Sequence, residues 1–269
     1  MKIFSILPRN NMVLYILSSS FAFLLRRRIK KIPAEIDNII VDMDRTLLKT
    51  NIGKEALIIC HGKEKADEIE HTIMRKVANG MMSMSDAMYR VINYLVEGKF
   101  THSDSNKIIE RCISGEIIRH NLLDSLLKLQ EKGKRIILAT MSTQRTADWF
   151  VNKYGFFGGL GTIEEYNENG IMTGCSQIIS EENKEVDGIK YRSKMYLIKE
   201  MFKERNIFFD ETKTAIITDD VTDLHIMRDV FLAIFLILKE PTKIQKLCYR
   251  LKLYDCPLKE NGDLEKLII

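Results

Sequence analysis

The residues best suited to chemistry in this sequence of 269 residues either follow short apolar runs or open a helix. Aspartates can act as nucleophiles, as acid–base groups or as metal ligands, and a lysine can neutralise developing negative charge. In chain order, the pattern is two aspartates, a threonine, a lysine and two more aspartates. The set is Asp42, Asp44, Thr140, Lys194, Asp219 and Asp223.

Four short apolar runs predict the strands that must position these side chains. The runs are Ile36–Val41, Ile136–Ala139, Ala215–Ile217 and Phe231–Phe235. Continuous apolar runs of this length are typical of strands buried on both faces of a parallel sheet. Because helical patterns alternate with them, we expect an α/β fold with a Rossmann-like, doubly wound parallel sheet. Ligands bind at the carboxyl ends of the strands in such sheets, which is where the polar residues fall.

The first two predicted strands are separated by a long segment of helical character. Residues 62–77 are charged and amphipathic, and Ser83 and Thr101 each begin a pattern typical of a capping box. We therefore expect a small all-helical domain at residues 51–119. It would be inserted into an α/β core made of residues 34–50 and 120–269.

The ordered set of motifs resembles the haloacid dehalogenase superfamily of phosphohydrolases, whose four motifs occur in this order. The match extends from about Asp37 to Leu247. The stretch 140–174, with a hydroxyl, a helix, a Gly-Phe turn and Gly170-x-x-Thr173-Gly174, resembles the phosphoserine-phosphatase-like branch with a helical cap. The insertion after the first motif lies where that branch carries its cap.

The resemblance implies a role for each residue. Asp42 is the expected nucleophile, which would form an aspartyl-phosphate. Asp44 is the expected general acid and base. Thr140 would hold phosphate oxygens, and Lys194 would neutralise the charge on the phosphoryl group during transfer.

The resemblance also implies a Mg²⁺ cofactor, since clustered carboxylates and a phosphate would repel one another without a cation. The expected ligands are Asp42, the backbone carbonyl of Asp44 and Asp219, with Asp223 completing or orienting the shell. Three of the assignments have close rivals in the sequence. Ser142 competes with Thr140, Lys190 with Lys194, and Asp220 with Asp219.

Other residues of the sequence depart from the family or have an ordinary structural explanation. Arg45 stands where the family often has glycine, and Thr218 and Asp220 stand where this branch often has glycine and serine. Three arginines of the insert could contact an anionic substrate group or lie on an exposed helix face. They are Arg75, Arg90 and Arg111. The methionines Met81, Met82, Met84 and Met88 are expected to fill the core, and the five histidines are expected to be structural or surface residues.

These observations favour a Mg²⁺-dependent phosphatase acting on a small phosphorylated metabolite. A phosphotransferase or mutase would use the same residues, and a non-catalytic binding protein with this fold is the third alternative. The five scattered cysteines predict neither a zinc site nor a disulfide framework. Nucleic acid is not an expected partner, because the net charge of +4 comes from the first 33 residues.

Residues 1–33 form a leader with seven basic and no acidic residues, leaving 34 basic and 37 acidic residues in the body. Its apolar run Met12–Leu25 is too short for a clean membrane span and lacks the layout of a signal peptide. Two readings remain open. The leader would either pack on the body as an extra helix or bind an anionic membrane surface. In both cases we expect a cytoplasmic protein, located at the inner face of a membrane in the second.

Overall fold

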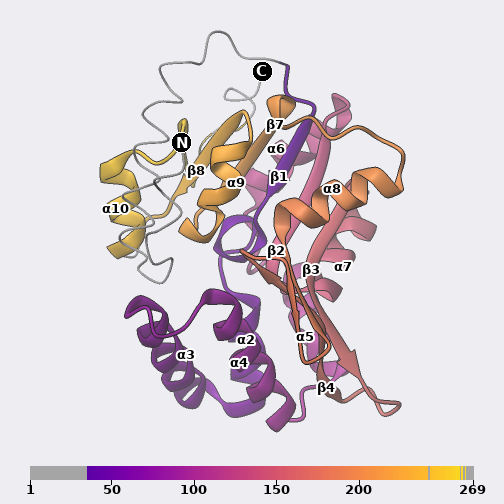
Figure 1. The fold of residues 1–269 in the computed structure, drawn as a ribbon, viewed down its shortest axis with the longest axis vertical. Coiled ribbons are helices and arrows are strands. Elements are labelled where there is room, and N and C mark those ends of the chain that lie inside the picture. Colours follow the sequence, from indigo (N-terminus) through magenta and orange to yellow (C-terminus); the bar gives the residue numbers. More distant parts are fainter. Residues whose placement is uncertain (1–34, 242, 261, 263, 265–269) are drawn as a thin grey trace.

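The computed structural model describes residues 35–241, 243–260, 262 and 264, and the leader lies outside them. Its centre is a nine-stranded sheet in the order β5-β6-β4-β3-β2-β1-β7-β8-β9. Each pair of neighbours in the run β3-β2-β1-β7-β8-β9 is parallel. The pairs β3–β4 and β5–β6 are antiparallel. This topology confirms the predicted α/β class and the mostly parallel sheet (Figure 1).

The strands are β1 (Asn38–Val41), β2 (Arg135–Thr143), β3 (Gly158–Tyr166), β4 (Met172–Ser180), β5 (Lys184–Val186), β6 (Ile189–Ser193), β7 (Thr214–Thr218), β8 (Leu232–Ile237) and β9 (Cys256–Lys259). The α-helices are α2 (Ile52–His61), α3 (Lys63–Ala78), α4 (Met84–Glu97), α5 (His102–Ile113), α6 (His120–Glu131), α7 (Gln144–Tyr154), α8 (Lys194–Glu204), α9 (Leu224–Asp229) and α10 (Lys243–Leu251). Short helical turns are η2 (Met43–Leu47), η3 (Glu211–Lys213) and η4 (Val221–Asp223).

The central strands are buried on both faces, as their continuous apolar sequences predict. Ile39 and Val41 of β1 contribute to one hydrophobic core and Ile40 to the other, because successive side chains of a strand point to opposite faces. The first core is shared with α6, α7 and the helices of the insert. The second core is shared with α8, α9 and α10. The sheet is thus covered by helices on both faces, the arrangement that parallel sheets require.

Five α-helices, α2 to α6, occupy the chain between β1 and β2, and the first four of them, α2 to α5, form the insert (Figure 1, indigo to magenta). Thr101 opens α5 with a complete capping box: its hydroxyl accepts from the Asp104 amide, and the Asp104 carboxylate accepts from the Thr101 amide. Ser83 opens α4 and accepts from the Asp86 amide. The return bond from the Ser83 amide is not formed, so this end is a simple N-cap.

The two chain segments that connect the insert to the sheet pair with each other. Leu48 and Ile118 form an antiparallel bridge, with hydrogen bonds from the Lys49 amide to the Ile117 carbonyl and from the Arg119 amide to the Leu47 carbonyl. Arg119 follows this bridge, is partly buried and pairs with Glu260 just after β9. A second antiparallel bridge, between Thr101 and Ile171, attaches the insert to the start of β4 as well.

None of the helices within the described residues is long and apolar enough to cross a bilayer. Both readings of the leader, packing on the body or binding a membrane surface, remain predictions, because residues 1–34 lie outside the described part of the chain.

The capping box of α5 predicts a measurable loss of stability in a single variant. We expect Thr101→Ala to lower the free energy of unfolding by about 1 kcal/mol, because the Asp104 amide loses its acceptor, whereas Thr101→Ser keeps the oxygen and stays near wild type. Chemical denaturation followed by circular dichroism measures the difference. Ser103→Ala, an exposed change in the same helical turn, is the matched control. An unchanged unfolding midpoint for Thr101→Ala would show that the cap contributes nothing.

Candidate active site

A buried lysine and two aspartates form an ion-paired group at the carboxyl ends of the central strands. Lys194, the first residue of α8, places its Nζ 2.9 Å from Oδ1 of Asp42 and 2.8 Å from Oδ1 of Asp223. Asp42 follows β1 directly, and Asp223 lies in the turn after β7. Residues about 150 positions apart in sequence, 42 and 194, are thus in direct contact.

Burial and mutual charge set the protonation of this group. Burial raises the pKa of Asp42 well above its ordinary value, and Lys194 opposes that shift while Asp223 adds to it. Burial lowers the pKa of Lys194, but the attraction of Asp223 and Asp42 outweighs burial and leaves it raised. The lysine is therefore charged at any physiological pH and is fixed beside the expected nucleophile.

Asp44 is held by hydrogen bonds from two different parts of the chain. Its Oδ1 accepts from the backbone amide of Ile52, the first residue of α2, at 2.8 Å. Its Oδ2 accepts from the hydroxyls of Thr140, at 3.2 Å, and of Ser142. Burial raises the pKa of Asp44, and these hydrogen bonds oppose that shift. A carboxyl group with a raised pKa is suited to donating and accepting a proton near neutral pH.

Asp219, which follows β7, is held on both carboxylate oxygens. Oδ1 accepts from the Thr46 hydroxyl at 2.8 Å, and Oδ2 accepts from Gln245 Nε2 of α10 at 2.7 Å. Arg45 Nε lies 3.9 Å from Oδ2. Burial and the neighbouring charge of Asp220 raise the pKa of Asp219 to about 7, although the Thr46 bond and Arg45 oppose the shift.

All six predicted site residues thus gather at one end of the sheet. Of the rivals, Ser142 shares the contact with Asp44, so the structure gives no reason to choose Thr140 over it. Lys190 is exposed on β6, away from the aspartates. Asp220 is beside Asp219, and its amide donates to the Thr218 hydroxyl.

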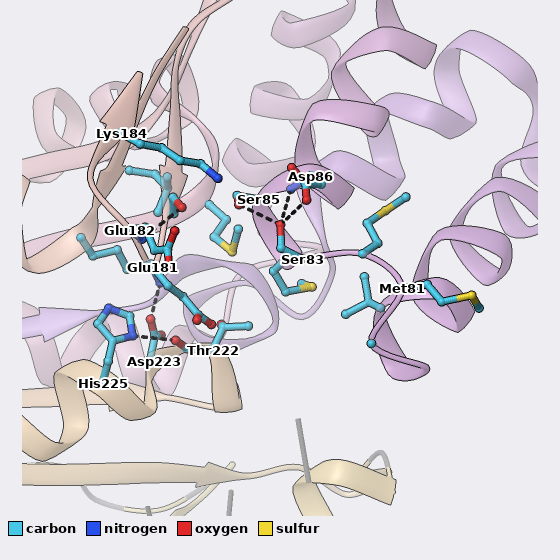
Figure 2. Close-up of a pocket in the computed structure, with 18 residues that line it drawn as sticks. Met81, Ser83, Ser85, Asp86, Glu181, Glu182, Lys184, Thr222, Asp223 and His225 are labelled. Atoms are coloured by element: carbon cyan, nitrogen blue, oxygen red, sulfur yellow. Dashed lines mark hydrogen bonds and ion pairs between the residues drawn. The ribbon is translucent and has the colours of Figure 1, made fainter. Parts of the chain in front are cut away.

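Three further residues of the site were not anticipated from the sequence. Thr46 and Gln245 orient Asp219, and His225 contributes to the wall of the cavity next to Asp223 (Figure 2). His225 Nδ1 lies 2.9 Å from the Thr222 carbonyl, whereas its buried Nε2 has no hydrogen-bond partner among the described residues. Only Thr46 carried a signal in the sequence, because it shares the short motif of Asp42 and Asp44.

The position of Met81 corrects one expectation, and the positions of the insert's arginines bear on a choice that the sequence left open. Arg75, Arg90 and Arg111 are not among the described residues that line the cavity beside Lys194 and Asp223, and Arg111 pairs with Glu55 of α2. Met81 was expected in the core, but it is 68% exposed and lines the cavity. It lies in the turn between α3 and α4, where none of the described elements covers it.

The donor set fits Mg²⁺ in its chemistry. Within the described residues, no three acidic, histidine or cysteine side chains form a ready-made metal cluster. Mg²⁺ commonly binds through only one or two carboxylates and keeps several waters. The expected ligands are consistent with such coordination, because they comprise two carboxylates, from Asp42 and Asp219, and the Asp44 carbonyl. Burial first, and the neighbouring carboxylates second, raise the pKa values of Asp42 and Asp219, and a bound cation would oppose both effects.

Comparison with known proteins agrees with this fold. A family model described as haloacid dehalogenase-like hydrolase matches residues 39–228. No curated protein sequence matches the chain. Among solved structures, a substrate-bound phosphoserine phosphatase complex is 14% identical, with a TM-score of 0.62, covering 87% of this chain and 98% of that one.

Two further structures share the fold. A HAD family hydrolase from Salmonella enterica serovar Typhi is 16% identical with a TM-score of 0.64, covering 93% of this chain and 79% of that one. A phosphoserine phosphohydrolase-like protein from Francisella tularensis is 17% identical with a TM-score of 0.63, covering 87% and 100%. The class is therefore that of α/β hydrolytic enzymes with an aspartate-rich site at the sheet edge. The chain belongs to the haloacid dehalogenase-like hydrolase family.

The crowding of carboxylates predicts how stability responds to pH. The folded-state pKa of Asp219, about 7, lies above its ordinary value of 3.8, so the folded protein binds this proton more tightly than the unfolded chain. The contribution of Asp219 to the free energy of unfolding is fully present below pH 3.8 and is lost as the pH rises from 3.8 to about 7. We expect the metal-free protein to melt at a lower temperature at pH 8 than at pH 5, and added Mg²⁺ to restore the loss.

The Asp219→Asn variant isolates this effect. It removes the charge, so its metal-free form should melt at least about 2–4 °C above wild type at pH 8, the shift expected for ~1 kcal/mol in a protein of this size. It should also lose the stabilisation by Mg²⁺. Asp229→Asn, an exposed aspartate at the end of α9, is the control and should behave as wild type. Equal Mg²⁺ stabilisation of Asp219→Asn and wild type would remove Asp219 from the ligand set.

Proposed function

We propose that this protein is a Mg²⁺-dependent phosphatase that hydrolyses a small phosphomonoester through an aspartyl-phosphate intermediate. The observation that carries the proposal is the buried contact of Lys194 with Asp42 and Asp223 at the carboxyl ends of β1 and β7. A nucleophilic carboxylate beside a fixed cation is suited to an anionic phosphoryl group. Membership in a hydrolase family and the fold shared with phosphoserine phosphatase support the same reaction.

In the first step, a carboxylate oxygen of Asp42 attacks phosphorus, and the bond from phosphorus to the ester oxygen breaks. Oδ1 of Asp42 is bonded to Lys194, so attack by Oδ2 leaves that ion pair in place. Asp44 donates its proton to the departing alkoxide, which leaves as an alcohol. The raised pKa of Asp44 favours the protonated form that this step needs.

In the second step, the Asp44 carboxylate takes a proton from a water molecule, whose oxygen attacks the phosphorus of the aspartyl-phosphate. The acyl-phosphate bond breaks, so Asp42 is regenerated and inorganic phosphate is released. Thr140 and Ser142 orient Asp44 for both proton transfers through their hydrogen bonds to Oδ2. Asp223 holds Lys194 in place throughout.

Asp42, Asp219 and the backbone carbonyl of Asp44 are the groups that would hold Mg²⁺, with Asp223 beside them. The bound cation would supply charge neutralisation for the phosphoryl oxygens. Thr46 and Gln245 fix the orientation of Asp219 for that role.

The inserted helices serve in this proposal as a cap over the site, with the boundaries 51–119 expected from the sequence. A cavity lined by Lys194 and Asp223 is bounded on one side by the turn between α3 and α4 and on the other by the segment after β4 (Figure 2). The Ile52 amide touches Asp44 directly, so the start of the cap contacts the proposed acid–base group. Enclosing the site in this way would limit access of water to the intermediate.

The two aspartates have different roles, which p-nitrophenyl phosphate can separate. We expect wild type with Mg²⁺ to release p-nitrophenol and inorganic phosphate, and EDTA to stop the reaction. Asp42→Asn should lose at least about 10³-fold in kcat and form no phosphoenzyme, since the nucleophile is gone. Asp44→Asn should still be phosphorylated, because p-nitrophenolate leaves without a proton, but should hydrolyse the intermediate slowly and accumulate it.

Acid-quench trapping of the phosphoenzyme, with ³²P-labelled substrate, measures this contrast. Circular dichroism confirms that each variant is folded, and Asp229→Asn serves again as the matched control. Near-normal turnover by Asp42→Asn would refute the covalent mechanism. Robust turnover by the metal-free protein would refute the role of Mg²⁺.

A further inference from the structure

A side chain of the core helix α7 contacts the first two turns of α5 in the insert. Arg145 Nη1 lies 3.0 Å from Nδ1 of His102, and Arg145 Nη2 donates to Oδ1 of Asn106 at 3.0 Å. An arginine has no acceptor, so Nδ1 of His102 accepts this hydrogen bond and the ring proton is on Nε2. One guanidinium thus makes two hydrogen bonds across the boundary between the core and the insert.

Both ends of this contact are held by the sheet. The ring of His102 stacks on Tyr166 of β3, with 3.9 Å between the ring centres. Burial, and after it the charge of Arg145, lower the pKa of His102, so the ring is neutral at neutral pH and keeps its acceptor. On the core side, the carboxylate of Glu164 on β3 accepts from the backbone amide of Arg145. The contact therefore joins α5 to a part of the core that is itself fixed.

The insert in turn contacts the proposed acid–base group. Arg111, further along α5, pairs with Glu55 of α2. The amide of Ile52, the first residue of α2, donates to Oδ1 of Asp44 at 2.8 Å. Because α5 and α2 are ion-paired, a displacement of α5 would also move the amide that holds Asp44.

The core holds the same carboxyl group through its other oxygen. Oδ2 of Asp44 accepts from the hydroxyls of Thr140 and Ser142 near the end of β2. Helix α7 begins directly after this strand, and Arg145 is its second residue. Asp44 is thus held by the insert on one oxygen and by the core on the other, and Arg145 joins these two parts.

We propose that Arg145 is a positioning residue of the phosphatase reaction, which fixes α5 against α7 and thereby sets the geometry of Asp44. The inference rests on the proposed function, because it concerns the proton that Asp44 transfers. If α5 is released, Asp44 loses part of its support and donates its proton less efficiently. The loss is greatest for a leaving group that strongly needs a proton.

Two esters of similar shape test this effect on Asp44. Phenyl phosphate releases a more basic leaving group than p-nitrophenyl phosphate, so its hydrolysis depends more on proton donation. For Arg145→Met, we expect kcat/KM for phenyl phosphate to fall at least about tenfold relative to that for p-nitrophenyl phosphate. Lys153→Met, at an exposed position of the same helix, is the matched control and should keep the wild-type ratio.

Two variants of His102 separate its acceptor from its ring. His102→Phe keeps an aromatic ring that can stack on Tyr166 but has no acceptor, so it should lower the ester ratio as Arg145→Met does. His102→Asn can place an oxygen near the position of Nδ1 and should keep the ratio near wild type. The double variant Arg145→Met/His102→Phe should lower the ratio no further than Arg145→Met alone, because both changes remove the same contact.

The fluorescence of Trp149, the single tryptophan of the sequence, reports the position of α5 without any substrate. Trp149 lies one turn after Arg145 and lines a groove together with Ile109 and Ile113 of α5. If α5 separates from α7, water reaches the indole ring. Acrylamide should therefore quench the emission more strongly in Arg145→Met and His102→Phe than in wild type, and circular dichroism confirms that each variant is folded.

The outcomes separate this inference from the phosphatase proposal. No turnover of either ester by wild type with Mg²⁺ would overturn the phosphatase function and, with it, the role of Arg145 in the reaction. Turnover by wild type with the same ester ratio in Arg145→Met and Lys153→Met would overturn the inference alone. Equal ratios for His102→Asn and His102→Phe would show that the acceptor of His102 does not hold Arg145. Unchanged quenching in Arg145→Met would show that this residue does not fix α5.

Discussion

The site is organised by the buried ammonium group of Lys194. It is the one buried lysine in the part of the chain that the structure describes, and it lies between Asp42 and Asp223. Burying a charge is costly unless it is paired, and removal of one partner leaves the other uncompensated. The two ion pairs of Lys194 are kept only if the ends of β1 and β7 and the start of α8 hold their relative positions. The same contact that permits chemistry on an anion also fixes three elements of the fold.

The fold could be predicted from the sequence because its signals are local. Each of the four runs expected to form strands lies on an observed strand, β1, β2, β7 or β8, because a strand covered on both faces must be apolar throughout. The insert was visible from its length and from the N-cap patterns at Ser83 and Thr101. The aspartates and Lys194 could be chosen because their order along the chain resembled a known family.

The residues that orient the site were harder to foresee, because their signals depend on three-dimensional contacts. Gln245 lies on α10, 26 positions from Asp219. No motif in the surrounding sequence indicates that its side chain is a hydrogen-bond donor to Asp219. Met81 has an apolar side chain of the kind that usually packs in a core, but it lies in a turn that leaves it exposed. Arg45 shows the opposite case. Its φ of 58° lies in the left-handed region that glycine adopts most easily, which explains physically why the family often has glycine there. Its charge near Asp219 offers a compensating gain.

The paired connection between the insert and the sheet also determines which movements are open to these helices. A single flexible linker would let them swing and twist in any direction. Two adjacent segments, paired by the bridge between Leu48 and Ile118, restrict the relative movement of the insert and the sheet instead. Twisting or sliding would break the bridge and the Arg119–Glu260 pair beside it. Rotation would break a second contact between the insert and the sheet, where Thr101 bridges Ile171 and the His102 amide donates to the Gly170 carbonyl. The insert is therefore attached to the sheet at two separate places along its chain, and any displacement of its helices has to break the hydrogen bonds of at least one of them.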